Sequence, residues 1–196
     1  MFAKLIAVIG ACVAAVGCAT STEYKYDAPG QAYTSNIVLV DARPELEKTP
    51  EIGSLIATNE RYGIYRLGDA QTVPNRIDYF KSRLSSIDGN LFQGKDVALT
   101  HFVIVNNVQS AMRKAAISSV VGGSVGADIR NAKTLDKDLP YIEVSIELSF
   151  NGKVYASKQA VNYNAANREP ALRYPVEALK VAIDRAAEDF AIKAAN

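Results

Sequence analysis

The side chains best suited to chemistry in this sequence are few and widely separated. Both cysteines, Cys12 and Cys18, lie in the uncharged stretch ACVAAVGCAT near the N-terminus. His101 is the only histidine, so a metal site built from several imidazoles is excluded and a second imidazole cannot assist catalysis. A disulfide between the two cysteines would have to close within an apolar helix. Their position in the N-terminal segment explains them better.

That segment has the layout of a secretory signal. Lys4 is its one positive charge, and LIAVIGACVAAVG, thirteen residues without a charge, follows it. A membrane-spanning helix needs about 20 apolar residues, whereas the hydrophobic region of a signal peptide needs roughly 7–15. We therefore expect residues 1–17 to be a signal peptide.

The four residues AVGC, Ala15 to Cys18, resemble the lipobox of bacterial lipoproteins, in which small residues precede a cysteine. The resemblance implies cleavage before Cys18, a diacylglyceryl thioether on its sulfur and an acylated amine. An ordinary secretory signal would instead leave a free thiol. Two or three acyl chains anchor a protein firmly, because each buried CH₂ contributes about 0.8 kcal/mol. Ala19 stands where lipoproteins of the inner membrane often carry Asp, which favours the outer membrane and a domain facing the periplasm.

The rest of the chain has balanced charge. Without residues 1–17 it carries 21 basic and 21 acidic residues, which disfavours a nucleic-acid partner and electrostatic adhesion to anionic lipid. Residues 18–36 are polar and include Pro29 and Gly30, so we expect a flexible tether with a mean reach of roughly 25 Å. Residues 37–196 are expected to form one domain, stabilised by burial of apolar side chains.

Hydrophobic patterns predict the strands that position the polar side chains. We expect strands at Ile37–Val40, at Tyr62–Asp69 and at KDVALTHFVIVNN, which is apolar on both faces and therefore belongs inside a sheet. Strict alternation in that strand places His101 on one face together with Val97, Leu99, Val103 and Val105. The dipeptide Asn151-Gly152 predicts a tight hairpin that pairs Phe150 with Lys153. Farther along the hairpin, the solvent face brings Glu143 and Glu147 near Lys158.

Two segments have the 3.6-residue period of amphipathic helices. The predicted buried stripes are Val73, Ile77, Phe80, Leu84 and Ile87 in the first helix, and Val176, Leu179, Ile183, Ala187 and Phe190 in the second. Pro74 and Pro175 suit the first turn of each helix. The predicted fold class is α+β, a mostly antiparallel sheet with two long helices packed on one face.

Charged residues end two of the predicted strands. Asp41 and Arg43 lie in VDARP, and Arg66 and Asp69 lie in RLGD. These four residues are a candidate cluster. They either form structural ion pairs at neighbouring strand ends or recognise a charged ligand.

The segment AAISSVVGGSVGA, Ala115–Ala127, carries no charge and belongs to none of the predicted strands and helices. It could be a buried helix and turn, a flap that enters lipid or a partner's groove, or a mobile loop. Exposed apolar surface of this size usually marks an interaction site. The candidate interaction residues are Val120, Val121, Gly122, Gly123, Val125 and Gly126.

Catalysis has little support in the sequence. His101 and Asp41 could belong to a Ser/His/Asp set, but no G-x-S-x-G turn is present, and a histidine within a strand is more often structural. The stretch GGSVGAD lacks the lysine of a phosphate-binding loop. We expect neither a metal nor another cofactor.

The order of elements, with IVLVDARP as first strand, is similar to that of YajG-type lipoproteins and, more loosely, to the auxiliary lipoproteins of lipid-transporting ABC systems. The resemblance implies a non-enzymatic envelope role and carries over no site residues. We therefore expect an accessory protein of the outer membrane that binds an envelope protein in assembly or lipid transport. The alternatives are a membrane-active or self-assembling lipoprotein that uses segment 115–127, and an envelope hydrolase.

Overall fold

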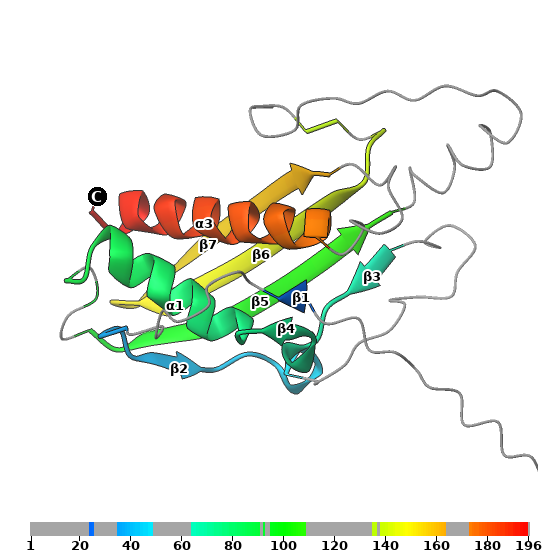
Figure 1. Ribbon diagram of the computed structural model, residues 1–196. Helices are drawn as coiled ribbons and strands as arrows, with labels where there is room; N and C mark the ends of the chain where they lie inside the picture. Colours follow the sequence, from blue (N-terminus) through cyan, green and yellow to red (C-terminus); the bar gives the residue numbers. More distant parts are fainter. Residues whose placement is uncertain are drawn as a thin grey trace, which may run out of the picture.

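The computed structural model describes residues 24–25, 35–48, 64–90, 92, 95–108, 135–136, 138–163 and 173–195 (Figure 1). The expected signal peptide, Cys18 and the apolar segment 115–127 with its candidate interaction residues lie outside these ranges.

The elements follow one another in a fixed order along the chain. They are β1 (Tyr24–Lys25), β2 (Leu39–Asp41), the 3-10 helix η1 (Glu45–Glu47), β3 (Ile64–Arg66), the 3-10 helix η2 (Asp69–Gln71), β4 (Thr72–Val73), α1 (Arg76–Ile87), β5 (Val97–Asn107), β6 (Tyr141–Phe150), β7 (Lys153–Asn162) and α3 (Arg173–Ala195).

The main sheet of the described residues is mixed. Its path runs β2-β5-β6-β7, and β3 also pairs with β5. Since β6 lies along one edge of β5, the short strands β2 and β3 share the other edge: β2 runs parallel to Val97–Leu99 and β3 antiparallel to Val105–Asn107. The α+β class is confirmed, but the expected mostly antiparallel sheet needs correction, because the first strand enters parallel to the interior strand.

The hairpin prediction is confirmed. Asn151 and Gly152 both have positive φ, 52° and 71°, the conformation that this two-residue turn requires. Phe150 pairs with Lys153, and the ladder continues to Ile142 opposite Val161. On the solvent face Lys158 forms an ion pair with Glu143 at 2.9 Å. Glu147 instead lies opposite Ala156 and His101.

A β-bulge changes which residues of β5 face the core. The register with β6 shifts between Leu99 and His101. Before the bulge Val97 and Leu99 are buried, and after it Phe102 and Ile104 take over the core face. The expectation that His101 shares a face with Val97 and Leu99 is therefore wrong, since the extra residue of a bulge inverts the alternation of the strand.

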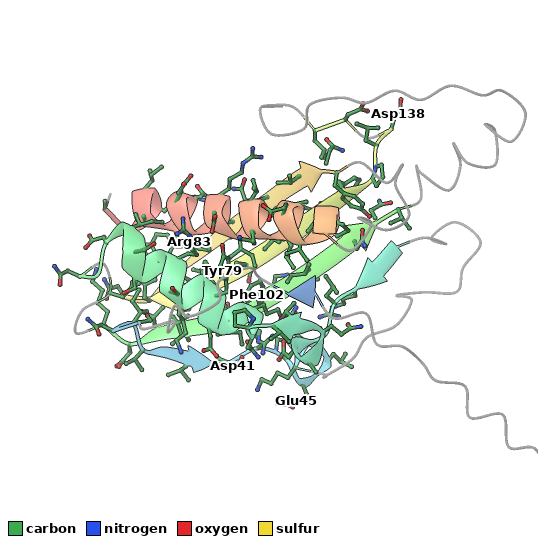
Figure 2. All side chains as sticks on the ribbon, in the orientation of Figure 1. Asp41, Glu45, Tyr79, Arg83, Phe102 and Asp138 are labelled. Carbon is green, nitrogen blue, oxygen red and sulfur yellow. The ribbon has the colours of Figure 1, made fainter. Side chains whose placement is uncertain are left out.

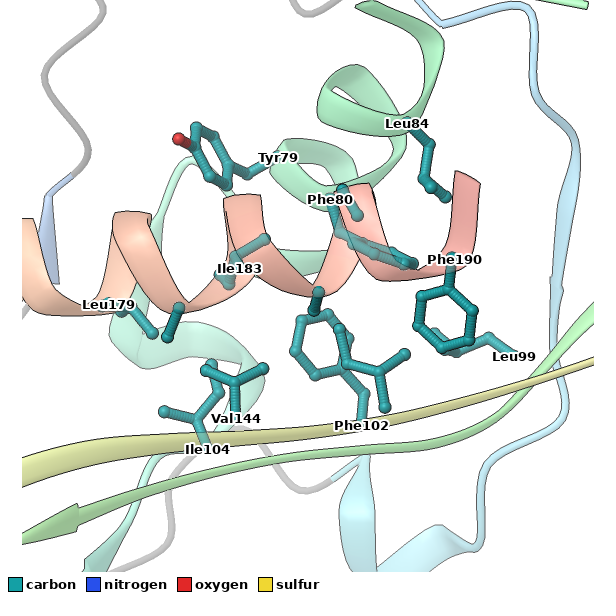
Figure 3. Packing of buried hydrophobic residues seen from close by; sticks show 14 of the residues in the cluster. Tyr79, Phe80, Leu84, Leu99, Phe102, Ile104, Val144, Leu179, Ile183 and Phe190 are labelled. Atoms are coloured by element: carbon teal, nitrogen blue, oxygen red, sulfur yellow. The ribbon is translucent and has the colours of Figure 1, made fainter. Parts of the chain in front are cut away.

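The hydrophobic core lies between the sheet and the helices (Figure 3). Phe80 of α1 contacts the rings of Phe102 on β5 and Phe190 on α3, with centroids 5.8 Å and 5.9 Å apart. All five residues of the predicted stripe in α3 are buried. In α1 the stripe is shorter than predicted. Val73 is exposed because the helix begins only at Arg76, with Asn75 accepting the hydrogen bond of Ile77 N–H as its N-cap. Ile87, the last residue of the helix, is exposed as well.

Part of the expected tether pairs with the short strand β4, which precedes α1. β1 runs parallel to β4 and places Tyr24 opposite Thr72. Farther along, the Ser35 hydroxyl donates to the Lys81 carbonyl at 3.3 Å. Both contacts hold the N-terminal side of the described chain close to α1.

Candidate functional site

The candidate site lies at the edge of β5, where β2 and β3 leave a gap between them. β2 ends opposite Leu99 and β3 ends opposite Val105, so among the described residues no strand pairs with this edge of β5 between these points. Glu47 of η1 fills the gap. Its carboxylate accepts a hydrogen bond from the Phe102 N–H at 2.9 Å and contacts His101 Nδ1 at 2.6 Å. The Glu47 side chain thus provides the acceptor for a backbone N–H at this edge that a neighbouring strand would otherwise provide.

Arg43 lies between two carboxylates close to this gap. Its Nε and Nη2 donate to the two oxygens of Asp41, each at 2.8 Å. Its Nη1 and Nη2 donate to the two oxygens of Asp69 at 3.0 Å and 2.7 Å. Its Nη1 also donates to the Glu47 carbonyl at 3.2 Å. Bidentate pairs of this kind fix orientation as well as charge. In Figure 2, Asp41 and Glu45 mark this region beside β2 and the start of α1.

Arg76, the first residue of α1, completes the assembly from the other side. The side chain is fully buried. Its Nε donates to Asp69 at 2.7 Å, Nη1 to the Leu67 carbonyl at 3.0 Å, and Nη2 to the Glu47 carbonyl at 3.0 Å. The guanidinium carbon lies 5.1 Å from the ring centre of Phe102, within range of a cation–π contact. We call Asp41, Arg43, Glu47, Asp69 and Arg76 the arginine cluster.

The charges of the arginine cluster stabilise one another. The hydrogen bond from Arg43 lowers the pKa of Asp41 below its ordinary value, despite an opposing effect of burial. Burial acts to raise the pKa of Asp69, but the hydrogen bond from Arg43 and the charge of Arg76 outweigh it, and the pKa is lowered. Burial likewise acts to lower the pKa of Arg43, and its two carboxylate partners raise it instead. Asp41, Arg43 and Asp69 are therefore ionised at neutral pH.

Arg66 does not join the cluster. It lies on β3 opposite Val105, and its Nε and Nη2 are buried without a hydrogen-bond partner among the described residues. Of the four residues that the sequence grouped together, the structure pairs Asp41, Arg43 and Asp69 and separates Arg66. The reason is the two-residue alternation of a strand, which turns Arg66 and its neighbour Leu67 to opposite faces.

The sequence did not reveal the role of Arg76 and Glu47. One signal was available for Arg76: a cation in the first turn of a helix opposes the helix dipole, so an arginine there needs a compensating partner. Glu47 offered no such signal. It lies in the charged stretch that follows Pro44, and its role depends on a strand edge far away in the sequence.

His101 and Asp41, the two residues considered for a catalytic set, are held apart by different partners. His101 contacts Glu47, and Asp41 is bound by Arg43. A histidine with a carboxylate at Nδ1 is half of a catalytic arrangement, but a nucleophile must also lie within reach. Within the described ranges, no hydroxyl forms a hydrogen bond with the His101 ring.

The described residues contain no group of three or more His, Cys, Asp and Glu side chains that could hold a metal ion. None of their helices is long and apolar enough to cross a membrane.

Comparison of the chain with protein-family models, with curated proteins and with solved structures finds no match.

Proposed function

We propose that the mature protein is a lipoprotein of the outer membrane that begins at an acylated Cys18 and binds an envelope component without catalysis. The observation that carries the proposal is the sequence of the N-terminus: a single lysine, a charge-free stretch of signal length and the small residues before Cys18. The described domain is compatible with this role, because the carboxylates of Asp41 and Asp69 are engaged with arginines of the same chain.

The architecture that goes with this role has both long helices on one face of the sheet. Buried residues of α1 and α3 belong to the same core as the buried face of β5 and β6, which supports this arrangement. The other face carries Val105, Glu143 and Lys158 and is the face that a periplasmic partner would meet.

The anchor is tested by mass spectrometry of the native N-terminus. We expect a chain that begins at Cys18 with the added mass of a diacylglyceryl group and an acyl chain. Cys18→Ser should release the protein into the soluble fraction. Cys12→Ser is the matched control, because it alters the other cysteine of the same stretch and should leave the anchor intact. A native chain that begins elsewhere, or that lacks the added mass, would refute the proposal.

The membrane assignment has its own test at Ala19. Ala19→Asp should move the protein from the outer to the inner membrane, as judged by separation of the two membranes on a density gradient. Asp at the next position, Thr20→Asp, controls for the added charge. An unchanged distribution of the Ala19→Asp protein would count against sorting by this residue.

The binding role is tested by cross-linking and purification of the anchored protein. Segment 115–127 is our proposed contact, and it can be deleted without disturbing the ladder, since Asn107 and Tyr141 on either side lie opposite each other. Loss of a defined envelope partner on deletion supports the role. The same partners with and without the segment would exclude it. Flotation of the Cys18→Ser protein with liposomes would favour the membrane-active alternative.

A further inference from the structure

Arg66 lies on the face of the main sheet that is turned away from the hydrophobic core. In the ladder it pairs with Val105, which pairs with Glu143 on β6. Directly opposed residues point to the same face. The next residue, Leu67, donates its N–H to Ile104, and both are buried in the core. Arg66 therefore belongs to the opposite face, with Glu143 in the same row.

The guanidinium of Arg66 is buried in an unusual way. Nε and Nη2 are both shielded from solvent and have no hydrogen-bond partner among the described residues. Buried polar groups in native proteins are nearly always hydrogen-bonded, and a charged donor without a partner is especially unfavourable. A pair of such donors on one side chain therefore indicates a group that binds there.

Arg43 shows to which group the same two nitrogens donate elsewhere in this protein. Nε and Nη2 of Arg43 donate to the two oxygens of Asp41, each at 2.8 Å. Nε–H and one Nη2–H of a guanidinium point in parallel, at a spacing that matches the two oxygens of a carboxylate. Arg66 presents the same pair of donors.

The described acidic residues near Arg66 are engaged elsewhere. Glu143, in the same row, forms an ion pair with Lys158. Asp69, three residues along the chain, is bound by Arg43 and Arg76. Arg66 is thus a single cation next to a balanced pair of charges. The pairing of the same two nitrogens of Arg43 with Asp41 favours a carboxylate as the partner of Arg66.

We propose that Arg66 binds a carboxylate group of a ligand, with Nε and Nη2 each donating to one oxygen. This inference rests on the non-catalytic binding role proposed above and gives the ligand a chemical class. The carboxylate belongs either to a free small acid or to an acidic side chain of a bound protein. Both sources present the same two oxygens to the arginine.

The test is NMR of arginine Nε–H groups in the mature protein, labelled with ¹⁵N and held in detergent micelles. Titration with acetate at constant ionic strength should move the Arg66 signal until it saturates and leave the Arg43 signal unchanged. A blocked Gly-Asp-Gly peptide distinguishes the sources. Binding tighter than that of acetate indicates a protein side chain, and equal binding indicates a free acid.

Variants sharpen the titration. Arg66→Lys keeps the charge and removes the parallel donors, so acetate should bind about tenfold more weakly or worse. Arg83→Lys is the matched control, because Arg83 donates to Asp184 on the helical side of the molecule and should leave the binding of acetate unchanged. The titration of the unaltered protein needs no variant, so a poorly folded variant cannot obscure the result.

Three results would overturn the proposal: an Arg66 signal that acetate and the peptide leave in place, inorganic phosphate that binds as tightly as acetate, or equal acetate binding by the Arg66→Lys protein. The mass of the N-terminus, measured on the same sample, shows separately whether the lipid anchor is present. Failure of the anchor and failure of the carboxylate site are therefore distinguishable.

Discussion

Arg76 and Arg66 are only ten positions apart in the sequence, yet their surroundings differ completely. Arg76 is fully buried and donates to Asp69, to the Leu67 carbonyl and to the Glu47 carbonyl. Arg66 is partly buried, and two of its nitrogens have no partner among the described residues. A buried cation is compatible with a stable fold when its N–H groups are hydrogen-bonded. When they are not, a bound ligand can supply the missing acceptors.

The difference arises from where each residue lies on the sheet. Arg76 lies where η1, η2 and α1 meet the edge of β5, and that convergence supplies backbone carbonyls and a carboxylate. Arg66 lies on a strand, where its backbone pairs with Val105 and its side chain stands out from the sheet. Matched substitutions at the two arginines and at their partners test the comparison.

The largest effect is expected at Arg76. Arg76→Met removes a buried guanidinium, takes its donors from Asp69 and from the Leu67 carbonyl, and leaves the Glu47 carbonyl with Arg43 alone, which should lower the free energy of unfolding by about 3–5 kcal/mol. Urea denaturation followed by circular dichroism measures the loss. The control is Arg83→Met, which removes a partly exposed ion pair with Asp184 and should cost at most about 1 kcal/mol. Equal losses in the two variants would contradict a structural role for Arg76.

The next effect is expected at Asp69, the carboxylate that joins the two arginines of the cluster. Asp69→Asn keeps the shape and removes the charge, so we expect a loss of about 2 kcal/mol at neutral pH. The pKa of Asp69 is lowered in the folded protein. Its contribution to stability is therefore complete above its ordinary pKa of 3.8 and is lost as the pH falls through the folded value.

The pH dependence supplies a second measurement for this variant. The difference in stability between the original protein and Asp69→Asn should stay constant above pH 3.8 and should shrink below it, as the pH falls toward the lowered pKa of the folded Asp69. Denaturation curves between pH 7 and pH 3 compare them. A difference that stays constant over this range would assign the loss to shape rather than to charge.

A smaller effect is expected at Glu47. Glu47→Gln leaves one oxygen to accept from Phe102 N–H but removes the charge that faces His101, so we expect a loss of about 1 kcal/mol. Hydrogen exchange of the Phe102 amide should also become faster. Glu45→Gln is the control, because Glu45 is exposed and pairs with Lys48 on the surface; its effect should stay within about 0.5 kcal/mol.

The smallest effect on stability is expected at Arg66. Arg66→Met replaces a partly buried cation, two of whose donors lack partners, by an apolar side chain, so the free energy of unfolding should stay within about 1 kcal/mol of the original or rise. The same urea denaturation as for Arg76→Met measures it. A loss as large as that at Arg76 would mean that Arg66 has a structural partner, and the contrast between the two sites would disappear.

Local patterns predicted those elements whose partners lie nearby in the sequence. The Asn151-Gly152 turn sets the register of β6 and β7, because a two-residue loop leaves no other pairing. The stripe of α3, Val176 to Phe190, follows from the helical period. The bulge after Leu99 was not predicted, because an alternating sequence does not show where a strand contains an extra residue.

The arginine cluster could be predicted only in part, for the same reason. Asp41 and Arg43 are two positions apart, and any turn after β2 lets them meet. Asp69 reaches Arg43, and Arg76 reaches the Glu47 carbonyl, because η2 and the start of α1 lie beside η1, although these segments are distant in the sequence. The charged residues at the predicted strand ends indicated an ion-pair cluster, but they did not show that Arg66 lies outside it.

The sequence by itself determined the α+β class, the hairpin and the buried stripe of the last helix, because turn chemistry and periodicity act over a few residues. It also provides the N-terminal pattern on which the proposed anchor at Cys18 depends. The tertiary structure alone decided that β2 enters parallel to β5 and that Glu47 closes the gap beside β3. It also decided that Arg76 is paired, while two nitrogens of Arg66 have no partner among the described residues. Those outcomes depend on which distant segments meet, and burial then makes a missing partner costly for a charged group.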